Sequence, residues 1–168
     1  MTAVTSSRSA AVTLPSDTEI LVTREFNAPK ELVYKAYTTP ELIERWWTAK
    51  RGAMRICEVD LRVGGKWRYV MDAEAGFEVG FHGEFLEIVP NERLVSTEVY
   101  EGAPVPEGEE EHAVVNTLTL TEIDGRTILT LLTDAKTKEV RDTIIESGME
   151  DGLQDALDLL EQAAIALT

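Results

Sequence analysis

The sequence predicts a single α+β domain in which a curved antiparallel sheet wraps around a long C-terminal helix. Apolar, β-favouring segments between residues 19 and 133 are joined by hairpin signals, and no parallel strand–helix–strand rhythm appears. From Thr137 onward, apolar residues recur at helical spacing and carboxylates occupy the remaining faces. A hairpin-linked sheet has one face to bury, and this helix is the element large enough to cover it. Because a twisted sheet that closes over one helix leaves space between them, we expect an apolar pocket there.

Turn and cap signals bound the predicted elements in order. Glu19–Phe26 is rich in β-favouring residues and is the first predicted strand. Two short helices follow: one opens at Ala28-Pro29, with Pro29 as its first residue, and the next opens at Thr38-Thr39-Pro40-Glu41, where Thr38 and Glu41 have the spacing of a capping box. Further strands are predicted over residues 54–63, 66–72, 79–89, 93–100, 114–123 and 126–133, with hairpin turns at Gly64-Gly65 and Asp124-Gly125. Residues 101–111 are predicted as an acidic loop, and a single helix is predicted to begin near Thr137.

Length and charge exclude several classes of protein. At 168 residues the chain suits one domain, which we place over residues 18–168, while residues 1–17 are rich in Ser, Thr and Ala and are predicted as a disordered tail. No apolar run reaches the ~20 residues that a membrane span needs, so membrane insertion is not expected. A net charge of -15, from 31 acidic and 16 basic residues, disfavours binding to nucleic acid. The lone Cys57 excludes an internal disulfide and fits a cytoplasmic location.

Two glycines in the predicted final helix suggest where the pocket lies. Gly148 and Gly152 are four residues apart and share one helix face, and each costs about 1 kcal/mol relative to Ala. Either a neighbouring element packs closely against this face, which is the commoner reason, or a void is left there for a ligand. The residues expected to line the pocket are Trp46, Trp47, Trp67, Tyr69, Met71, Phe81, Phe85, Leu118, Leu129, Gly148, Met149, Gly152 and Leu153, although for any single one a core position is the commoner role. Because adjacent residues of a helix diverge by about 100°, one of Trp46 and Trp47 should pack and the other should line an opening or a partner surface.

The chain carries little recognisable catalytic machinery. His82 and Glu84 lie on one face of a predicted strand and are candidates for a general acid or base. They face outward, however, if Phe81 and Phe85 face inward. The Gly-x-Ser-x-Gly elbow of hydrolases and the phosphate-binding P-loop are both absent from the sequence.

Other polar residues offer weaker signals. His82, His112 and Cys57 have no companions at ligand spacing, so neither a metal site nor a cofactor is expected. Glu98 and Asn116 are strand residues that could orient a ligand, unless they occupy an ordinary outward face.

Four segments resemble, in order, the signatures of a known family. They are residues 28–41 followed by Trp46-Trp47, residues 60–67, residues 83–94 and residues 148–153. These segments are similar to the activator of heat-shock-protein ATPase homologue-like family of the START-like, polyketide cyclase (SRPBCC) superfamily, and the resemblance covers roughly residues 19–167. It implies a helix-grip fold with a hydrophobic cavity between the sheet and the final helix. One departure is Leu153, where the family usually places tryptophan after the glycine that Gly152 matches, and this loss of bulk would reshape the cavity.

We therefore expect the chain to bind a small hydrophobic or amphipathic ligand in this cavity. An enzyme of the cyclase or dehydratase type is one alternative, and it requires a histidine or a carboxylate that faces the cavity. A chaperone-regulating interaction module is another. The resemblance disfavours it, since the chaperone activators carry a separate N-terminal domain that does not precede residue 19 here. Open sheet edges leave a homodimer as an option.

Overall fold

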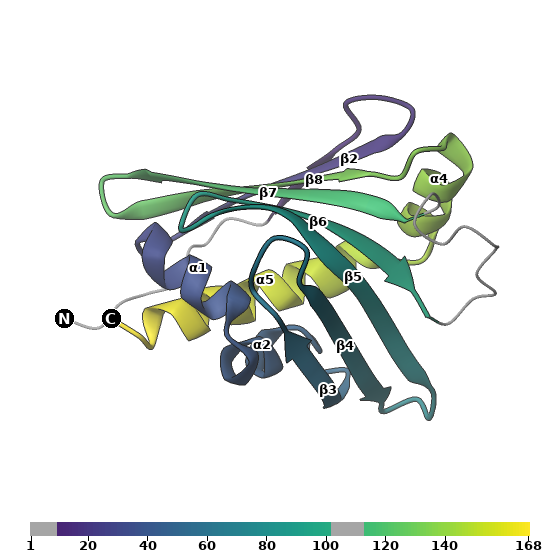
Figure 1. Cartoon of the computed structure of the whole chain (residues 1–168), viewed down its shortest axis with the longest axis horizontal. Helices are drawn as coiled ribbons and strands as arrows, with labels where there is room; N and C mark the ends of the chain where they lie inside the picture. Colours follow the sequence, from purple (N-terminus) through teal and green to yellow (C-terminus); the bar gives the residue numbers. More distant parts are fainter. Residues whose placement is uncertain (1–9, 102–112) are drawn as a thin grey trace.

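The computed structural model describes residues 10–101 and 113–168. Within these residues, eight antiparallel strands form one sheet that curves around a long helix near the C-terminus, as Figure 1 shows. The strands are β1 (Ala11–Thr13), β2 (Glu19–Phe26), β3 (Gly52–Val59), β4 (Lys66–Ala73), β5 (Glu78–Val89), β6 (Arg93–Tyr100), β7 (Val114–Ile123) and β8 (Arg126–Asp134), and the helices are α1 (Lys30–Thr38), α2 (Pro40–Trp46), α4 (Lys138–Glu146) and α5 (Met149–Ile165). The order across the sheet is β1-β2-β8-β7-β6-β5-β4-β3, which confirms the predicted α+β fold.

The hairpin predicted at Asp124-Gly125 is confirmed, whereas the one predicted at Gly64-Gly65 is wrong in length, because residues 60–65 all belong to the connection between β3 and β4. Asp124 and Gly125 both have positive φ, 53° and 77°, which is the geometry of a two-residue hairpin between β7 and β8. The strand predicted over residues 54–63 is shorter than expected, since β3 ends at Val59. The residues that follow form a turn so tight that a Cβ on Gly65 would lie 2.0 Å from the Asp60 carbonyl oxygen. Close approach of the backbone therefore requires glycine there.

The two helices after β2 begin near prolines, but their caps differ from the prediction. Pro40 is the first residue of α2, as expected, whereas Pro29 is the extended N-cap residue of α1 rather than its first residue. The capping box predicted for Thr38 and Glu41 does not form. Thr38 ends α1, and its hydroxyl donates to the Tyr34 carbonyl at 2.8 Å. Because Thr38 is buried, this intrahelical bond satisfies a hydroxyl that has no access to water.

Part of the segment predicted as a disordered tail is ordered. Residues 1–9 lie outside the described residues, whereas Ala11–Thr13 pair with β2 as strand β1. The prediction of disorder over residues 1–17 is therefore wrong for this part. Gln154 of α5 holds the adjacent backbone, because its side-chain amide accepts from Ala10 N at 2.9 Å and donates to the Ala10 carbonyl at 2.8 Å. Of the acidic loop predicted over residues 101–111, only Glu101 lies within the described residues.

The C-terminal segment folds as two helices rather than as the single helix predicted. Thr137 caps α4 and its side chain accepts from Val140 N, which confirms the predicted start. Helix α4 ends at Glu146, and Gly148 then adopts left-handed backbone with φ 81°. A left-handed residue ends the run of helical hydrogen bonds and turns the chain, and glycine adopts this conformation without the penalty of a Cβ. Apolar residues keep helical spacing on both sides of Gly148, which is why the pattern concealed the break.

The core lies between the helices and the inner face of the sheet, which we define as the face toward α5. Alternation along β2 turns Ile20, Val22, Arg24 and Phe26 inward, where all four are buried. Antiparallel pairing continues this face across the sheet, for example from Arg24 to Leu129 on β8. Helices α1 and α2 pack against α5 and close one end of the core (Figure 1).

One ion pair is buried within this core. The side chains of Arg24 on β2 and Glu161 on α5 are fully inaccessible to solvent, and Arg24 Nη2 lies 3.1 Å from Glu161 Oε1. Glu161 Oε2 also accepts from Asn27 N at 2.8 Å, and Arg24 Nη1 donates to the exposed carboxylate of Asp158. Burying either charge without its partner costs several kcal/mol, so the pair favours one position of α5 against β2.

The two glycines of the C-terminal segment should respond oppositely to alanine substitution. Gly148→Ala should lower the free energy of unfolding by roughly 1 kcal/mol, because an L residue resists left-handed backbone. Gly152→Ala should raise it by roughly 0.5–1 kcal/mol, since Gly152 lies inside α5 and a Cβ there would meet no atom within 4 Å. Urea unfolding of both variants measures these changes. A stabilising Gly148→Ala would contradict the helix break.

Removing one partner of the buried ion pair should destabilise the protein strongly. Glu161→Ala leaves Arg24 without its buried counter-charge and should lower the free energy of unfolding by roughly 3–5 kcal/mol. Asp155→Ala is the matched control on the same helix, because it breaks only a surface pair with Arg51 and should cost less than about 1 kcal/mol. Thermal and urea unfolding compare the two variants. Equal losses would show that packing alone positions α5.

Candidate functional site

The inner face of the sheet is apolar at one end and polar at the other. Phe26 and Leu129 represent the apolar end and are almost fully buried. At the other end, where β8 leads into α4 (Figure 1), the inward positions of β6, β7 and β8 hold Glu98, Asn116 and Thr133. All three are half-buried. The polar end therefore differs from a close-packed apolar core in both chemistry and burial.

Side-chain hydrogen bonds join these three residues. Thr133 Oγ1 donates to Asn116 Oδ1 at 2.7 Å, so the amide nitrogen of Asn116 is the group that donates to Glu98. Burial raises the pKa of Glu98 above its ordinary value, although the hydrogen bond from Asn116 opposes this increase. Glu98 therefore keeps its proton to a higher pH than an exposed glutamate does. A protonated carboxyl can donate a hydrogen bond as well as accept one.

Two tyrosine hydroxyls lie near this carboxyl, and the thiol of Cys57 lies beside one of them, on the strand position that pairs with Tyr69. Burial raises the pKa of Tyr37 and of Tyr69, and nearby acidic groups that include Glu98 raise both further. Both hydroxyls are therefore protonated at neutral pH and can donate hydrogen bonds. Burial also raises the pKa of Cys57 to about 11, so its thiolate is scarce at neutral pH. This set of groups suits hydrogen bonding and proton transfer better than nucleophilic attack.

An aromatic cluster lines the same part of the inner face. Trp47, just after α2, meets Tyr69 and Phe81 edge-on, with ring centroids 5.5 and 6.0 Å apart. Trp67 lies 4.8 Å from Tyr69, and Tyr100 lies 5.1 Å from Phe81. These five rings come from β4, β5, β6 and the end of α2. Their apolar surface stands next to the polar groups of β6 and β7, which is the composition typical of ligand pockets.

One buried donor in the aromatic cluster has no partner among the residues that the structure describes. Trp67 is only 6% exposed, and its indole Nε1 makes no hydrogen bond within the part of the chain that the structure describes. An unsatisfied buried donor costs roughly 1–3 kcal/mol, so each such group in a native protein requires an explanation. Trp46 shows the usual arrangement, since its Nε1 donates to the Ala36 carbonyl at 2.9 Å. The Trp67 N–H therefore marks a place where an added acceptor would be stabilised.

A recess of about 480 Å³ opens at the β4–β5 hairpin. Met71 and Val79, which pair directly across the two strands, form part of its wall, and Lys50 and Arg51 contribute two cations. Met71 and Val79 lie two residues along their strands from Tyr69 and Phe81, on the same face. The recess is thus the neighbour of the aromatic cluster on the inner face.

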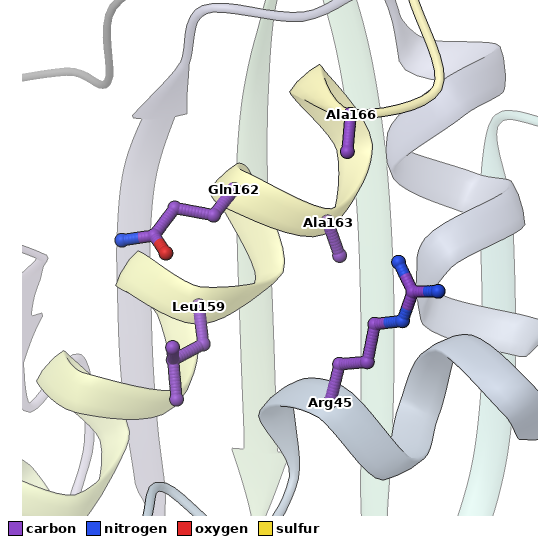
Figure 2. Close-up of a pocket in the computed structure, with 5 residues that line it drawn as sticks. All are labelled: Arg45, Leu159, Gln162, Ala163 and Ala166. Atoms are coloured by element: carbon purple, nitrogen blue, oxygen red, sulfur yellow. The ribbon is translucent and has the colours of Figure 1, made fainter.

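A smaller recess of about 170 Å³ lies between α2 and α5. Figure 2 shows Arg45 extending from α2 toward the C-terminal end of α5, and the other lining side chains come from this half of the helix and from the residue that follows it. These are Leu159, Gln162, Ala163 and Ala166. None of the five lining residues belongs to the predicted site or to the aromatic cluster. Among the described residues that line this recess, Arg45 is the charged one.

Most of the predicted lining residues do lie on the inner face. Those on strands are Trp67, Tyr69, Met71, Phe81, Phe85, Leu118 and Leu129. Trp46 and Trp47 diverge as expected, since Trp46 is buried in the core and Trp47 joins the aromatic cluster. Met149, Gly152 and Leu153 are half-buried in the first turns of α5.

Gly148 is a correction to the predicted site. It is exposed at the break between α4 and α5, so it does not share an inner helix face with Gly152. Close packing of another element, the commoner explanation for both glycines, is also wrong, because a Cβ on either residue would meet no atom of another described element within 4 Å. Gly148 is required for its left-handed backbone.

The polar end of the site was only partly visible in the sequence. Glu98 and Asn116 were recognised as polar strand residues, but an outward face was left as the ordinary explanation, and Thr133 was not considered. Spacing along the strands could have identified both residues, because each lies an even number of positions from a buried leucine. Glu98 lies four residues after Leu94, and Asn116 lies two before Leu118. On regular strands such spacing puts both polar side chains on the core face.

The acid–base pair suggested by the sequence faces away from the site. Phe81 and Phe85 lie on the inner face, so His82 and Glu84 point outward, as the sequence argument required. On that outer face His82 Nδ1 lies 2.8 Å from Glu101 Oε2. Neither residue can reach a ligand on the inner face.

Metal-binding and membrane-spanning features were also sought in residues 10–101 and 113–168. Over these ranges no three His, Cys, Asp or Glu side chains come together in a way that could hold a metal ion. No helix there combines the length and the apolar character needed to cross a bilayer. His112 lies outside the described residues.

Glu98 should make stability depend on pH in a defined direction. Its folded pKa lies above the ordinary value of 4.5, so between these two values the folded state keeps a proton that the unfolded state has lost. Stability should therefore fall as pH rises through this window and become constant above the folded pKa. Glu98→Gln removes the titrating group, so its stability relative to wild type should increase as pH rises above 4.5. Urea unfolding at a series of pH values measures this difference, with Glu84→Gln on the outer face as control. A difference that does not change with pH would contradict the burial of an ionisable Glu98.

Comparison with known proteins agrees with this architecture. The family described as Activator of Hsp90 ATPase homolog 1-like protein matches residues 27–164. A crystal structure of a protein from Rhodobacter sphaeroides is 27% identical, with a TM-score of 0.82 over 94% of this chain and 99% of that chain. A protein from Nitrosomonas europaea is 26% identical, with a TM-score of 0.77 over 89% of this chain and 96% of that chain.

A protein from Plasmodium falciparum described as an Hsp90 activator is a more distant likeness. It is 23% identical, with a TM-score of 0.52 over 70% of this chain and 73% of that chain, and the similarity concerns the fold alone. No curated protein matches this chain significantly. The family match extends from the end of β2 to the end of α5 and includes all four segments that resemble the family signatures. The chain therefore belongs to the Activator of Hsp90 ATPase homolog 1-like family and has its helix-grip fold.

Proposed function

We propose that this chain binds a small amphipathic molecule on the inner face of the sheet, beside the N-terminal half of α5. The aromatic cluster would contact the apolar part of the molecule, and the polar group would lie near Glu98. The observation that carries this proposal is the hydrogen-bonded set Glu98, Asn116 and Thr133 on a face that should otherwise be core. Polar groups on an inner face are costly unless they are paired or used.

Differences in burial along the inner face support the same proposal. Phe26 and Leu129, at the apolar end, are 0% and 1% exposed. Tyr69, Phe81 and Trp47 remain half-buried although they belong to the same face or lie against it. The partly exposed surface of these side chains is surface that a bound molecule would cover, which supports binding at the polar end.

An enzyme of the cyclase or dehydratase type is the second candidate. That activity requires a titratable group that faces the ligand, and Glu98 has the required orientation. Tyr69 is a neighbouring hydroxyl that could donate to a developing oxyanion. Binding is common to both candidates, so a test of binding comes first.

A chaperone-regulating role has weaker support. Such a role would use an exposed apolar surface that was expected to include Trp46 or Trp47. Trp46 is buried, and Trp47 is held by two ring contacts on the inner face. The likeness to the Plasmodium falciparum activator is confined to the fold and adds no information about partners.

Binding can be tested with a defined aromatic probe and two matched variants. Wild-type protein should bind 1-naphthol in isothermal titration calorimetry, and protein purified from its host should carry a small molecule in native mass spectrometry. Trp47→Ala removes a ring of the aromatic cluster and should weaken 1-naphthol by about tenfold. Ile123→Ala removes an exposed apolar side chain at the end of β7 and should have no effect. Absence of binding by wild type, or equal binding by Trp47→Ala, would rule out this site.

A further inference from the structure

Three residues form one row across adjacent strands of the polar end. Trp67 on β4 pairs directly with Gly83 on β5. The β5–β6 pairs on either side, His82 with Val99 and Phe85 with Ser96, place Gly83 opposite Glu98 by register. Trp67 and Glu98 therefore flank a glycine, and no side chain stands between them in this row.

The indole of Trp67 lies over Gly83. A Cβ built on Gly83 would lie 2.7 Å from Trp67 Nε1, so the unpartnered N–H sits directly against the glycine backbone. The same Cβ would lie 1.8 Å from the Thr97 carbonyl oxygen. Any larger residue at this position would therefore displace both the indole and the β6 backbone, so glycine is required for the indole to lie against β5.

Side-chain hydrogen bonds also fix the backbone beside Gly83 and the carboxyl of Glu98. Glu84 N donates to the Thr97 hydroxyl at 3.0 Å, a side-chain bond within the β5–β6 ladder. On the other side of the row, Asn116 donates to Glu98 and is itself fixed by Thr133. The Glu98 carboxyl is thus held in position by its neighbours.

We propose that the site recognises a neutral hydroxyl or carbonyl oxygen, which binds between Trp67 Nε1 and the Glu98 carboxyl. This inference rests on the proposed function and names the chemical class of its ligand. A carbonyl oxygen would accept from the indole N–H and from a protonated Glu98. A hydroxyl would accept from the indole and donate to the Glu98 carbonyl oxygen.

Charge explains why the oxygen should be neutral. Burial raises the pKa of Glu98, which shows that this end of the inner face disfavours negative charge. A second carboxylate placed beside Glu98 would meet the same cost and would add repulsion whenever Glu98 ionises. Carboxylate ligands should therefore bind more weakly than alcohols or ketones that have the same apolar part.

Three probes that share one ring system test this class. Naphthalene, 1-naphthol and 1-naphthoate differ only in the polar group, and calorimetry should rank 1-naphthol tightest. Trp67→Phe keeps an aromatic ring but removes the N–H, so it should weaken 1-naphthol by about fivefold while naphthalene is unchanged. Glu84→Gln, on the outer face of β5, should leave the order of the probes unaltered.

The indole signals provide a readout that does not depend on the variant's stability. The chain has three tryptophans, and the Trp67 Nε1–H resonance is the one that disappears in Trp67→Phe. In wild type it should move downfield with 1-naphthol and not with naphthalene. This inference would be overturned if the Trp67 Nε1–H chemical shift did not change when 1-naphthol binds, or if 1-naphthoate bound more tightly than 1-naphthol. Either result would leave the proposed function unaffected. If no probe binds, both fail.

Discussion

The buried pair of Arg24 and Glu161 favours one position of α5 against β2, and the arrangement of the inner face depends on that position. Two opposite charges without access to water are tolerated only when they meet, so β2 and α5 have a strongly favoured alignment. This alignment brings the apolar C-terminal half of α5 against α1 and α2. The resulting end of the molecule is closed by Phe26, Ile43 and Leu160.

The N-terminal half of α5 is held by different contacts. Arg51 pairs with Asp155 at 3.0 Å on the surface, and Gln154 binds the backbone of Ala10. These contacts lie at the margins of the helix rather than beneath it. Because they do not fill the inner face, α5 can be fixed in place while Glu98 and Asn116 remain only half-buried.

The polar end of the sheet combines features that rarely persist in a core without a use. A carboxyl, two tyrosine hydroxyls and an indole N–H that lacks a partner within residues 10–101 and 113–168 lie on or against the inner face of the β4–β8 half of the sheet. In a close-packed apolar interior each would need an internal partner. Membership of the Activator of Hsp90 ATPase homolog 1-like family accounts for the helix-grip architecture but does not specify these side chains.

Local patterns in the sequence determined the strands, the turns and the family. β2, β6 and β7 have the predicted bounds, because alternation and the adjoining Asp124-Gly125 turn depend on residues close together in the chain. The inward orientation of Phe81 and the outward orientation of His82 followed from the same alternation. Helical spacing of the apolar residues was compatible with one helix or with two, and the prediction of one helix was wrong. Gly148 lay within this uninterrupted spacing, and only its φ of 81° reveals a break.

The tertiary structure alone decided which polar residues meet. Trp67, Gly83 and Glu98 come from three strands, and their alignment in one row is set by the register between strands rather than by spacing along any one of them. The link from Glu98 through Asn116 to Thr133 likewise needs three strands side by side. Single-strand periodicity can say which face a residue occupies. It cannot say what stands opposite that residue, because register depends on turns, bulges and packing throughout the sheet.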